Sequence, residues 1–355
     1  MGGDPGRSRL SQGREGPVRP LRRGPGEPRR FQENRLHREI RFAHLSDWHA
    51  TTLAGGGLDR FRGKRISGWA SWALNRRRHH DPAILDAAIR DVHAQSVDRI
   101  LVTGDLTHIS LPQEFRVAAG QLARLGSPEE VFLIPGNHDC YVRTDPENAW
   151  DHWAPYLRGA ASSSLPSPLA PLASPSPEDG RAPTYADYPT LRIHDRLAII
   201  GLCSSIPTPI FVAGGELGAQ QLERLEALLS ATGDAGYFRV LMIHHPIAAG
   251  TEPARRALWD GEALCGVLAR TGAELVLHGH KHRRRLRTVP GPRADVPIVG
   301  VPSTSEVGSK PDKQAQYHVY TVREEAGGAF TLGAEIRGYD AAQGAFVPVS
   351  ESLFG

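Results

Sequence analysis

Five short polar clusters lie along this chain, each at or near the end of an apolar run, and their side chains could bind metal ions. The clusters are Asp47-Trp48-His49, Gly104-Asp105, Gly136-Asn137-His138-Asp139, His244-His245 and Gly279-His280-Lys281-His282. Together they supply enough oxygen and imidazole ligands for two adjacent divalent ions. Because two adjacent ions promote in-line displacement at phosphorus, these residues indicate phosphoester chemistry before any fold is assigned.

The first two clusters each place a carboxylate where a strand would end. Asp47 and His49 are two residues apart, so on an extended strand end their side chains project to the same side. A carboxylate with an imidazole suits a borderline ion such as zinc, iron or manganese. Asp105 also follows an apolar run, where its carboxylate could bridge two cations, and Gly104 permits a tight turn there.

The third cluster offers the widest choice of groups. Asn137 has an amide oxygen, His138 a titratable imidazole, and Asp139 a carboxylate able to orient that imidazole. The last two clusters add histidines after apolar runs, namely His244, His280 and His282. A single histidine at a strand end is more often structural than a ligand. That explanation would have to hold at every cluster independently, so we favour a shared metal site.

Short β-rich runs that end in small or polar residues alternate with helix-period patterns. The predicted strands are 40–45, 99–103, 131–134, 197–202, 239–243, 274–277 and 297–301, with late strands in 317–322 and 330–336. Apolar stripes at helical spacing lie in 84–92, 115–122, 222–229 and 264–268. This alternation is typical of an α/β protein, in which ligands gather at the carboxyl ends of strands.

Composition sets limits on the class of protein. A net charge of +3 over 355 residues gives no general argument for nucleic-acid binding. The three cysteines are far apart and outside any C-x-x-C pattern, which fits reduced thiols. No apolar run approaches the roughly 20 residues that cross a bilayer, and the N-terminal region lacks the apolar core of a secretory signal. We therefore expect a cytoplasmic protein.

We expect one folded domain over residues 38–350. Residues 1–37 are rich in Gly, Pro and Arg and predict a disordered tail, with a basic arm for nucleic acid or anionic lipid as the alternative. Two insertions interrupt the domain. Residues 160–183 form a Ser/Pro-rich surface loop, and residues 58–80 form a basic, aromatic, amphipathic stretch.

The ordered series D-x-H, G-D, G-N-H-D, H-H and G-H-x-H, spread over residues 40 to 305, resembles the calcineurin-like metallophosphoesterases. The resemblance implies an α/β (α+β) fold, a four-layer β-sandwich flanked by helices, with a dimetal site at the carboxyl edge of the strands. It implies two divalent ions (Mn, Fe/Zn or similar) and a bridging hydroxide. The first ion would take Asp47, His49, Asp105 and His282. The second would share Asp105 and add Asn137, His244 and His280.

The same resemblance gives His138 the role of contacting the substrate and assisting departure of the leaving group, with Asp139 orienting it. The chain departs from the family at His108, where many members carry an aspartate. Because His108 is not expected to bind the metals directly, this change concerns fine geometry. Three further histidines next to the clusters are left out of the ligand set, since strand neighbours face opposite ways. They are His44, His245 and His278.

The metal core does not decide among phosphomonoesters, cyclic nucleotides, other phosphodiesters and pyrophosphates. The motifs look most like the bacterial subgroup that includes cyclic-nucleotide phosphodiesterases. The 58–80 insertion is instead similar to a segment of the enzymes that cleave UDP-2,3-diacylglucosamine. Its Arg76, Arg77 and Arg78 are candidate substrate contacts for a lipid-linked diphosphate. It would also suit peripheral contact at the inner membrane face.

Three alternatives stay open. The insertion could be only a solvated basic helix at the rim of the site. The chain could be a nuclease, with Arg283, Arg284 and Arg285 tracking a phosphate backbone, although we do not expect nucleic acid as a partner. It could also be a metal-free scaffold of the same fold, whose mark would be missing ligands, and none is missing. The sequence leaves the oligomeric state open.

Overall fold

In the computed structural model the chain divides into two units, Met1–Leu36 and His37–Gly355, and the description below concerns the second. The structure describes residues 1–2, 39–51, 53, 57, 61, 63–72, 79–172, 180–248, 250–308 and 312–354. Apart from its first two residues, the predicted tail 1–37 lies outside the described residues. The candidate substrate contacts Arg76, Arg77 and Arg78 also lie outside them.

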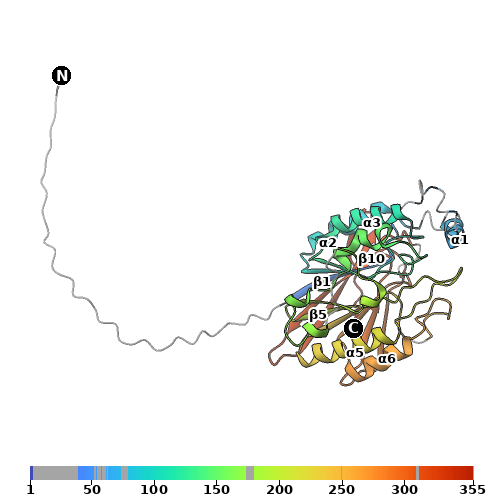
Figure 1. The fold of residues 1–355 in the computed structure, drawn as a ribbon. Coiled ribbons are helices and arrows are strands. Elements are labelled where there is room, and N and C mark those ends of the chain that lie inside the picture. Colours follow the sequence, from blue (N-terminus) through green and yellow to red (C-terminus); the bar gives the residue numbers. More distant parts are fainter. Residues whose placement is uncertain are drawn as a thin grey trace. The chain divides into compact units, whose positions relative to one another are not determined.

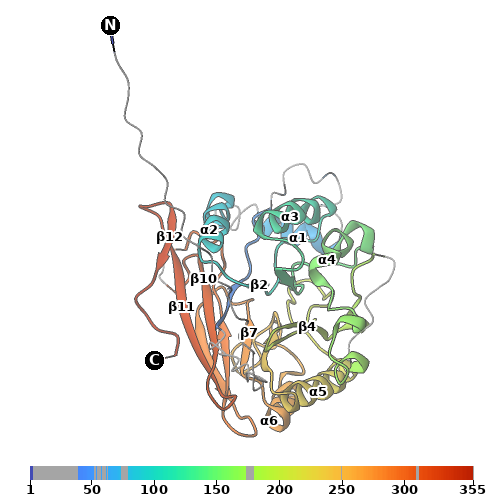
Figure 2. The ribbon, with the colours of Figure 1, turned by 90° about the vertical axis from the view of Figure 1, so that its left-hand side faces the viewer.

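Within the described residues the strands form two six-stranded sheets. The first has the order β12-β11-β10-β1-β2-β3 and the second the order β4-β5-β6-β7-β9-β8. The strands of the first sheet are β1 (Glu39–Leu45), β2 (Arg99–Val102), β3 (Val131–Leu133), β10 (Gln316–Glu324), β11 (Phe330–Asp340) and β12 (Ala345–Pro348). Those of the second are β4 (Thr190–His194), β5 (Leu197–Gly201), β6 (Phe238–Met242), β7 (Leu275–His278), β8 (Arg285–Val289) and β9 (Val296–Gly300). Figure 2 shows β10, β11 and β12 together at one side of the body.

Helices α2 (Pro82–Ala94), α3 (Pro112–Leu125), α5 (Ala219–Asp234) and α6 (Gly261–Thr271) cover the outer faces of the two sheets. The short helix α4 (Ala154–Leu157) joins the first of these layers, and α1 (Lys64–Ser71) lies apart, beside the residues of a small separate apolar cluster. The apolar stripes of α2 and α3 pack on the first sheet, and those of α5 and α6 pack on the second. Figure 1 shows these two helix pairs on opposite sides of the strands. Helix α2 begins at Pro82 for two reasons. The side chain of Asp81 caps the helix by accepting the N–H of Ala83, and Pro82 has no N–H that would be left unpaired in the first turn.

A third apolar cluster fills the space between the sheets. Strand β1 shows how the sequence divides its side chains, because Phe42 belongs to this inner cluster whereas Ala43 and Leu45 face the helices. Phe42 stacks on Tyr320 of β10 with ring centroids 5.0 Å apart, and Met242 reaches the same cluster from the second sheet. The structure is therefore a helix–sheet–sheet–helix sandwich, which confirms the predicted four-layer α/β (α+β) fold.

Parallel pairing brings the polar clusters to one edge. Strands β1, β2 and β3 run parallel, as do β5, β6, β7 and β9. The clusters follow the carboxyl ends of β1, β2, β3, β6 and β7. Since the carboxyl ends of parallel strands meet at one edge of a sheet, segments far apart in the sequence converge there.

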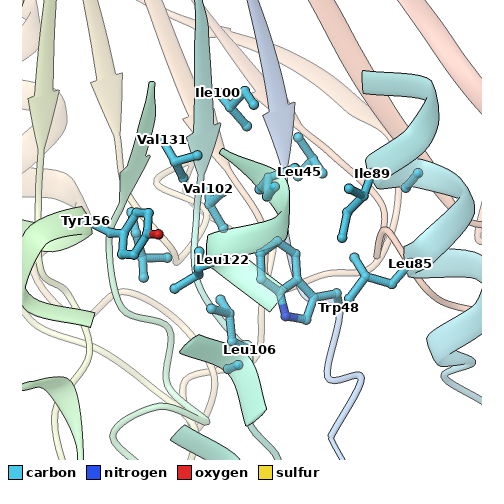
Figure 3. Close-up of a cluster of buried hydrophobic side chains, with 14 of the residues drawn as sticks. Leu45, Trp48, Leu85, Ile89, Ile100, Val102, Leu106, Leu122, Val131 and Tyr156 are labelled. Carbon is cyan, nitrogen blue, oxygen red and sulfur yellow. The ribbon is translucent and has the colours of Figure 1, made fainter. Parts of the chain in front are cut away.

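Trp48, the middle residue of the first cluster, anchors that edge in the core. Its indole is fully buried, and Figure 3 shows it between Leu45 at the end of β1, Leu85 of α2 and Leu106. Asp47 and His49 on either side are thereby held at the surface of the packed core. Because the indole of Trp48 is packed in the core, the turn that carries Asp47 and His49 is held in one position.

Among the described residues, none of the helices combines the length and apolar character that a bilayer crossing needs. The described parts of the 58–80 insertion include α1. Those of the 160–183 loop include two short 3-10 helices, Ser162–Ser164 and Ala170–Leu172.

Candidate metal centre

The backbone at the strand ends is strained where ligand residues sit. Five of the predicted metal ligands have left-handed φ angles, a conformation that side chains with a Cβ seldom adopt. They are Asp47 (52°), His49 (40°), Asp105 (58°), His280 (68°) and His282 (48°). Strain of this kind persists only where the surrounding structure enforces it, and it concentrates at functional sites.

Two glycines allow the second and third clusters to touch. Gly104 has a φ of 88°, and a Cβ there would lie 2.2 Å from the backbone nitrogen of Gly136. A Cβ on Gly136 would lie 2.2 Å from Oδ1 of Asp105. The glycines of the G-D and G-N-H-D motifs are therefore needed for close approach, which brings Asp105 beside Asn137 and His138.

The ligands predicted for the first ion lie together. Nε2 of His282 is 3.4 Å from Oδ1 of Asp47, and Nε2 of His49 is 3.7 Å from Oδ2 of Asp105. Ligands of one ion, bonded at about 2.0–2.2 Å, are separated by roughly 3–3.7 Å. The spacing of these atoms therefore fits a common cation.

The ligands predicted for the second ion are equally close. Nε2 of His244 is 3.3 Å from Oδ2 of Asp105 and 3.0 Å from Oδ1 of Asn137. Nδ1 of His280 is 2.8 Å from the same Asn137 oxygen. Oδ2 of Asp105 thus faces a histidine of each set, as the resemblance implies for a bridging carboxylate.

Hydrogen bonds from the opposite ring nitrogens turn these imidazoles toward the site. Nδ1 of His49 donates to the carbonyl of Thr107 at 2.6 Å, and Nδ1 of His244 donates to the carbonyl of Thr103 at 2.7 Å. A carbonyl can only accept, so in His49, whose ring is neutral, Nε2 carries the lone pair. Burial alone would lower the pKa of His244, but Asp105 raises that pKa to about 9. Nε2 of His49 is buried without a hydrogen-bond partner in the described part of the chain. Such an atom is what a metal ligand presents, and the donor set fits a divalent ion.

The charges of the predicted ligands also suit a metal site. Burial lowers the pKa of His49 and His280, and neighbouring imidazoles lower it further, so both rings are neutral. Burial raises the pKa of Asp105, but His244 and His138 outweigh it and hold that pKa below its ordinary value. Asp105 is therefore an anion, as a metal ligand should be.

Asp139 does not do what the sequence suggested. Its carboxylate accepts the backbone N–H groups of Asp105 (2.8 Å), Leu106 (3.0 Å), Thr107 (3.0 Å) and Gly136 (2.9 Å). The ring of His138 is instead held by the carbonyl of His108, which accepts its Nδ1–H at 2.5 Å. The prediction that Asp139 orients His138 disagrees with these contacts. Asp139 joins the G-D turn to the G-N-H-D turn, and burial and Asp105 raise its pKa to about 7.

His138 lies at the mouth of the ligand cluster. Its ring centroid is 4.8 Å from that of His49, and the ring stacks on Tyr141 at 5.7 Å with an interplanar angle of 12°. Because Nδ1 donates to a carbonyl, Nε2 is the atom that can exchange a proton with a ligand in the cavity.

Two residues of this site were missed by sequence reasoning. Glu306 accepts Nδ1–H of His282 at 2.9 Å and so orients a predicted ligand. The ring of His80 lies 4.8 Å from that of His49, and its Nδ1 contacts Ser305 Oγ at 3.0 Å. Glu306 could have been found from the sequence, because it ends a polar run, Ser303-Thr304-Ser305-Glu306, that follows a predicted strand. His80 was harder to find, because it is the last residue of the 58–80 insertion and does not follow a strand.

The residues left out of the ligand set are engaged elsewhere. Nε2 of His44 contacts Thr103 Oγ1 at 2.9 Å, Nδ1 of His245 contacts Ser204 Oγ at 2.8 Å, and Nδ1 of His278 donates to the carbonyl of Gly279 at 2.9 Å. His108, the departure from the family pattern, lies beside His49 with ring centroids 5.3 Å apart.

The predicted metal ligands lie at a cavity of about 460 Å³. Helix α1 contributes one wall through Lys64 and the neighbouring Trp72, and Phe211 lies on the lining. The described part of the 58–80 insertion therefore borders the site. The cavity is lined by Asp105, Asn137, His138, His280, His282, Glu306, His80, His108, Tyr141 and several cations.

Several solved structures are similar to this chain at low sequence identity. A dimetal phosphatase from Danio rerio is 13% identical, with 82% of this chain and 98% of that chain covered and a TM-score of 0.48. A 5'-nucleotidase precursor from Thermus thermophilus is 17% identical (83% and 54% covered, TM-score 0.45). A purple acid phosphatase from yellow lupin is 13% identical (88% and 53% covered, TM-score 0.47). This chain thus spans about half the length of the last two. Among curated proteins, no sequence matches it.

The assignment rests on a family model. The model described as calcineurin-like phosphoesterase matches residues 40–284, which is more than half of the chain and includes all five polar clusters. The match agrees with the fold and with the convergence of the clusters at one sheet edge. The chain belongs to the calcineurin-like phosphoesterases, metal-binding hydrolases that act on phosphoric esters.

Proposed function

We propose that this protein hydrolyses phosphoesters at a dinuclear centre, with Asp47, His49, Asp105 and His282 holding one divalent ion and Asp105, Asn137, His244 and His280 holding the other. The observation that carries the proposal is the position of Oδ2 of Asp105, 3.7 Å from Nε2 of His49 and 3.3 Å from Nε2 of His244. When bound, two metal ions held in this way would activate water and stabilise charge on phosphoryl oxygens. The identity of the ions, such as manganese, iron or zinc, is part of what the experiment must establish.

His138 supplies the proton that the leaving group needs. Its Nδ1–H is fixed on the carbonyl of His108, so Nε2 is the ring nitrogen left to carry the proton that a departing alkoxide takes up. General-acid help of this kind accelerates a reaction by about 10²–10⁴-fold. In this proposal no side chain is the nucleophile, so the reaction proceeds without a phospho-enzyme.

The substrate class follows from the walls of the cavity more than from the ligands. The cations Lys64, Arg255, Arg256, Lys281 and Lys313 line it. They favour an anionic substrate such as a phosphodiester or a phosphomonoester. A lipid-linked pyrophosphate of the UDP-2,3-diacylglucosamine type is the second candidate, because Trp72 and Phe211 add apolar surface beside those cations. A nuclease is less well supported, since Arg283, Arg284 and Arg285, the predicted contacts to a phosphate backbone, do not line this cavity.

The experiment is a substrate panel with metal analysis. Purified protein reconstituted with manganese, or with iron and zinc, is tested on p-nitrophenyl phosphate, bis-p-nitrophenyl phosphate, cyclic AMP, single-stranded DNA and a UDP-linked lipid diphosphate. We expect close to two ions per chain and turnover of at least one small phosphoester. An Asp105→Asn variant should lose both. Full metal content without turnover of any substrate would contradict the proposal and favour a binding scaffold.

A further inference from the structure

Large apolar side chains that solvent reaches are concentrated near the cavity mouth. In the described part of the second unit, eight such residues are exposed, and six come from segments that line or adjoin the cavity. Those six are Phe61, Ile66, Ile210, Phe211, Trp259 and Val307. Phe211 is 80% exposed, and the other five are 41–50% exposed. The remaining two are Val117 on the outer helix α3 and Leu286 on the edge strand β8.

Hydrogen bonds join these segments into one rim. Nζ of Lys64, on the helix that carries Ile66, donates to Thr208 Oγ1 at 2.9 Å and to the carbonyl of Val212 at 3.2 Å. The N–H of Ala213 donates to the carbonyl of Arg255 at 2.8 Å, and the N–H of Trp259 donates to the carbonyl of Gly215 at 2.8 Å. The N–H of Val307 donates to the carbonyl of His79, a cavity residue, at 2.8 Å. We call the six apolar residues and the cations between them the cavity rim. Figure 1 shows α1 at the outer side of the body, away from α5 and α6.

The cavity rim is basic as well as apolar. Arg255 and Arg256 are exposed on it, and Lys64, Lys281 and Lys313 lie on the cavity lining. The acidic residues on the same lining are Asp105, which lies among the predicted metal ligands, and Glu306, which accepts a hydrogen bond from His282. Lys281 and Arg256 both form ion pairs with Glu252, at 2.6 Å and 3.6 Å, so two cations share one carboxylate and the rim keeps its positive sign.

We propose that the cavity rim docks on an anionic lipid bilayer, with the mouth of the cavity toward the membrane. Separated aliphatic and aromatic side chains that project from a basic surface match the boundary between headgroups and acyl chains. Phosphate-bearing headgroups complement Arg255 and Arg256. Single-stranded nucleic acid would also meet the cations and could stack on Phe61, Phe211 and Trp259, but the other half of the apolar rim residues, Ile66, Ile210 and Val307, offer no aromatic face. The proposed hydrolysis does not require this docking, so the inference goes beyond it.

The test measures sedimentation of the full chain with two kinds of vesicle. One contains phosphatidylcholine alone, and the other contains about one third phosphatidylglycerol. We expect binding to the anionic vesicles that weakens as salt is raised. Replacing two rim residues, Ile66→Ser with Ile210→Ser, should weaken that binding about tenfold, and Arg255→Glu should weaken it further.

A matched control comes from the opposite layer of the fold. Val117→Ser removes an aliphatic residue of similar exposure from helix α3 and should leave vesicle binding unchanged. Residues 1–37 are present in every variant, so differences between variants report on the rim. Turnover of p-nitrophenyl phosphate should be equal in the wild type and in the Ile66→Ser, Ile210→Ser variant, since neither residue lines the cavity.

Equal vesicle binding by the wild type and the double isoleucine variant would overturn the proposal. So would a preference for single-stranded DNA that displaces the vesicles. The outcome is separable from the proposed function: vesicle binding without turnover would leave the docking in place, whereas turnover without vesicle binding would remove the docking alone.

Discussion

The carboxylate of Asp139 accepts the backbone N–H of Asp105 at 2.8 Å. The same carboxylate accepts the N–H of Gly136 at 2.9 Å, so one side chain fixes two turns that lie more than thirty residues apart in the sequence. The position of Asp105 between His49 and His244, where we propose that it bridges two ions, therefore depends on Asp139, which is not one of the proposed ligands. This division between residues that bind and residues that position determines which variants should lose metal and which should lose only turnover.

Asp139→Asn should lose both metal and stability. The amide has one acceptor oxygen in place of two and adds donors that face backbone N–H groups, so buried donors lose their partners. We expect a loss of about 1–3 kcal/mol in the free energy of unfolding, together with reduced metal content. Thermal unfolding and elemental analysis check this. Normal metal content with a normal melting temperature would contradict the positioning role.

His138→Ala should keep its metal and lose turnover by about 10²–10⁴-fold. The loss should be largest for substrates with poorly acidic leaving groups, because p-nitrophenolate departs with little help from an acid. Tyr141→Phe is a matched control, since it preserves the ring stacked at 5.7 Å and removes only a hydroxyl. An equal fall of metal content and turnover in His138→Ala would mean that the residue is a ligand.

Glu306→Gln should weaken metal binding by about 10–100-fold, because the carboxylate that orients Nδ1 of His282 at 2.9 Å is replaced by a neutral amide. Titration of the metal-free protein with manganese or zinc measures the change. Asp312→Asn is a suitable control, since Asp312 is a nearby exposed carboxylate that pairs with Arg283 at 3.7 Å. Similar affinities for both variants would show that Glu306 has no special role.

The resemblance to the metallophosphoesterases implied the four-layer fold and the ligand set, and the sequence pattern itself predicted an α/β protein whose candidate ligands follow apolar strands. Parallel strands carry such residues to one edge whatever the loops between them do. The sequence pattern did not predict the contacts that side chains in the turns make. Asp139 was paired with its neighbour His138, whereas the turn directs its carboxylate back to Asp105. His80 and Glu306 come together through a β-bridge between distant segments, which no local pattern encodes. The ligand roles themselves remain predictions until metal is measured.

Lys64 should make substrate binding sensitive to alkaline pH. Its Nζ lies 4.3 Å from the centroid of the Tyr141 ring, on the cavity lining, and burial lowers the pKa of Lys64 to about 8. The ammonium form exists below that pKa, so its attraction for a phosphate is complete in neutral solution and is lost as pH rises through about 8. We therefore expect KM to rise about three- to tenfold between neutral pH and about pH 9.

The matched variants separate this effect from other titrations in the site. Lys64→Arg stays charged at every pH tested, so its KM should stay flat where that of the wild type rises. Lys313→Arg makes the same substitution at another cavity lysine and should retain the wild-type rise. Any titration of the metal centre alters all three proteins alike and cancels in the comparison. If KM of Lys64→Arg climbs in parallel with the wild type, then Lys64 does not contact the phosphate, and the basic wall formed by α1 has another purpose.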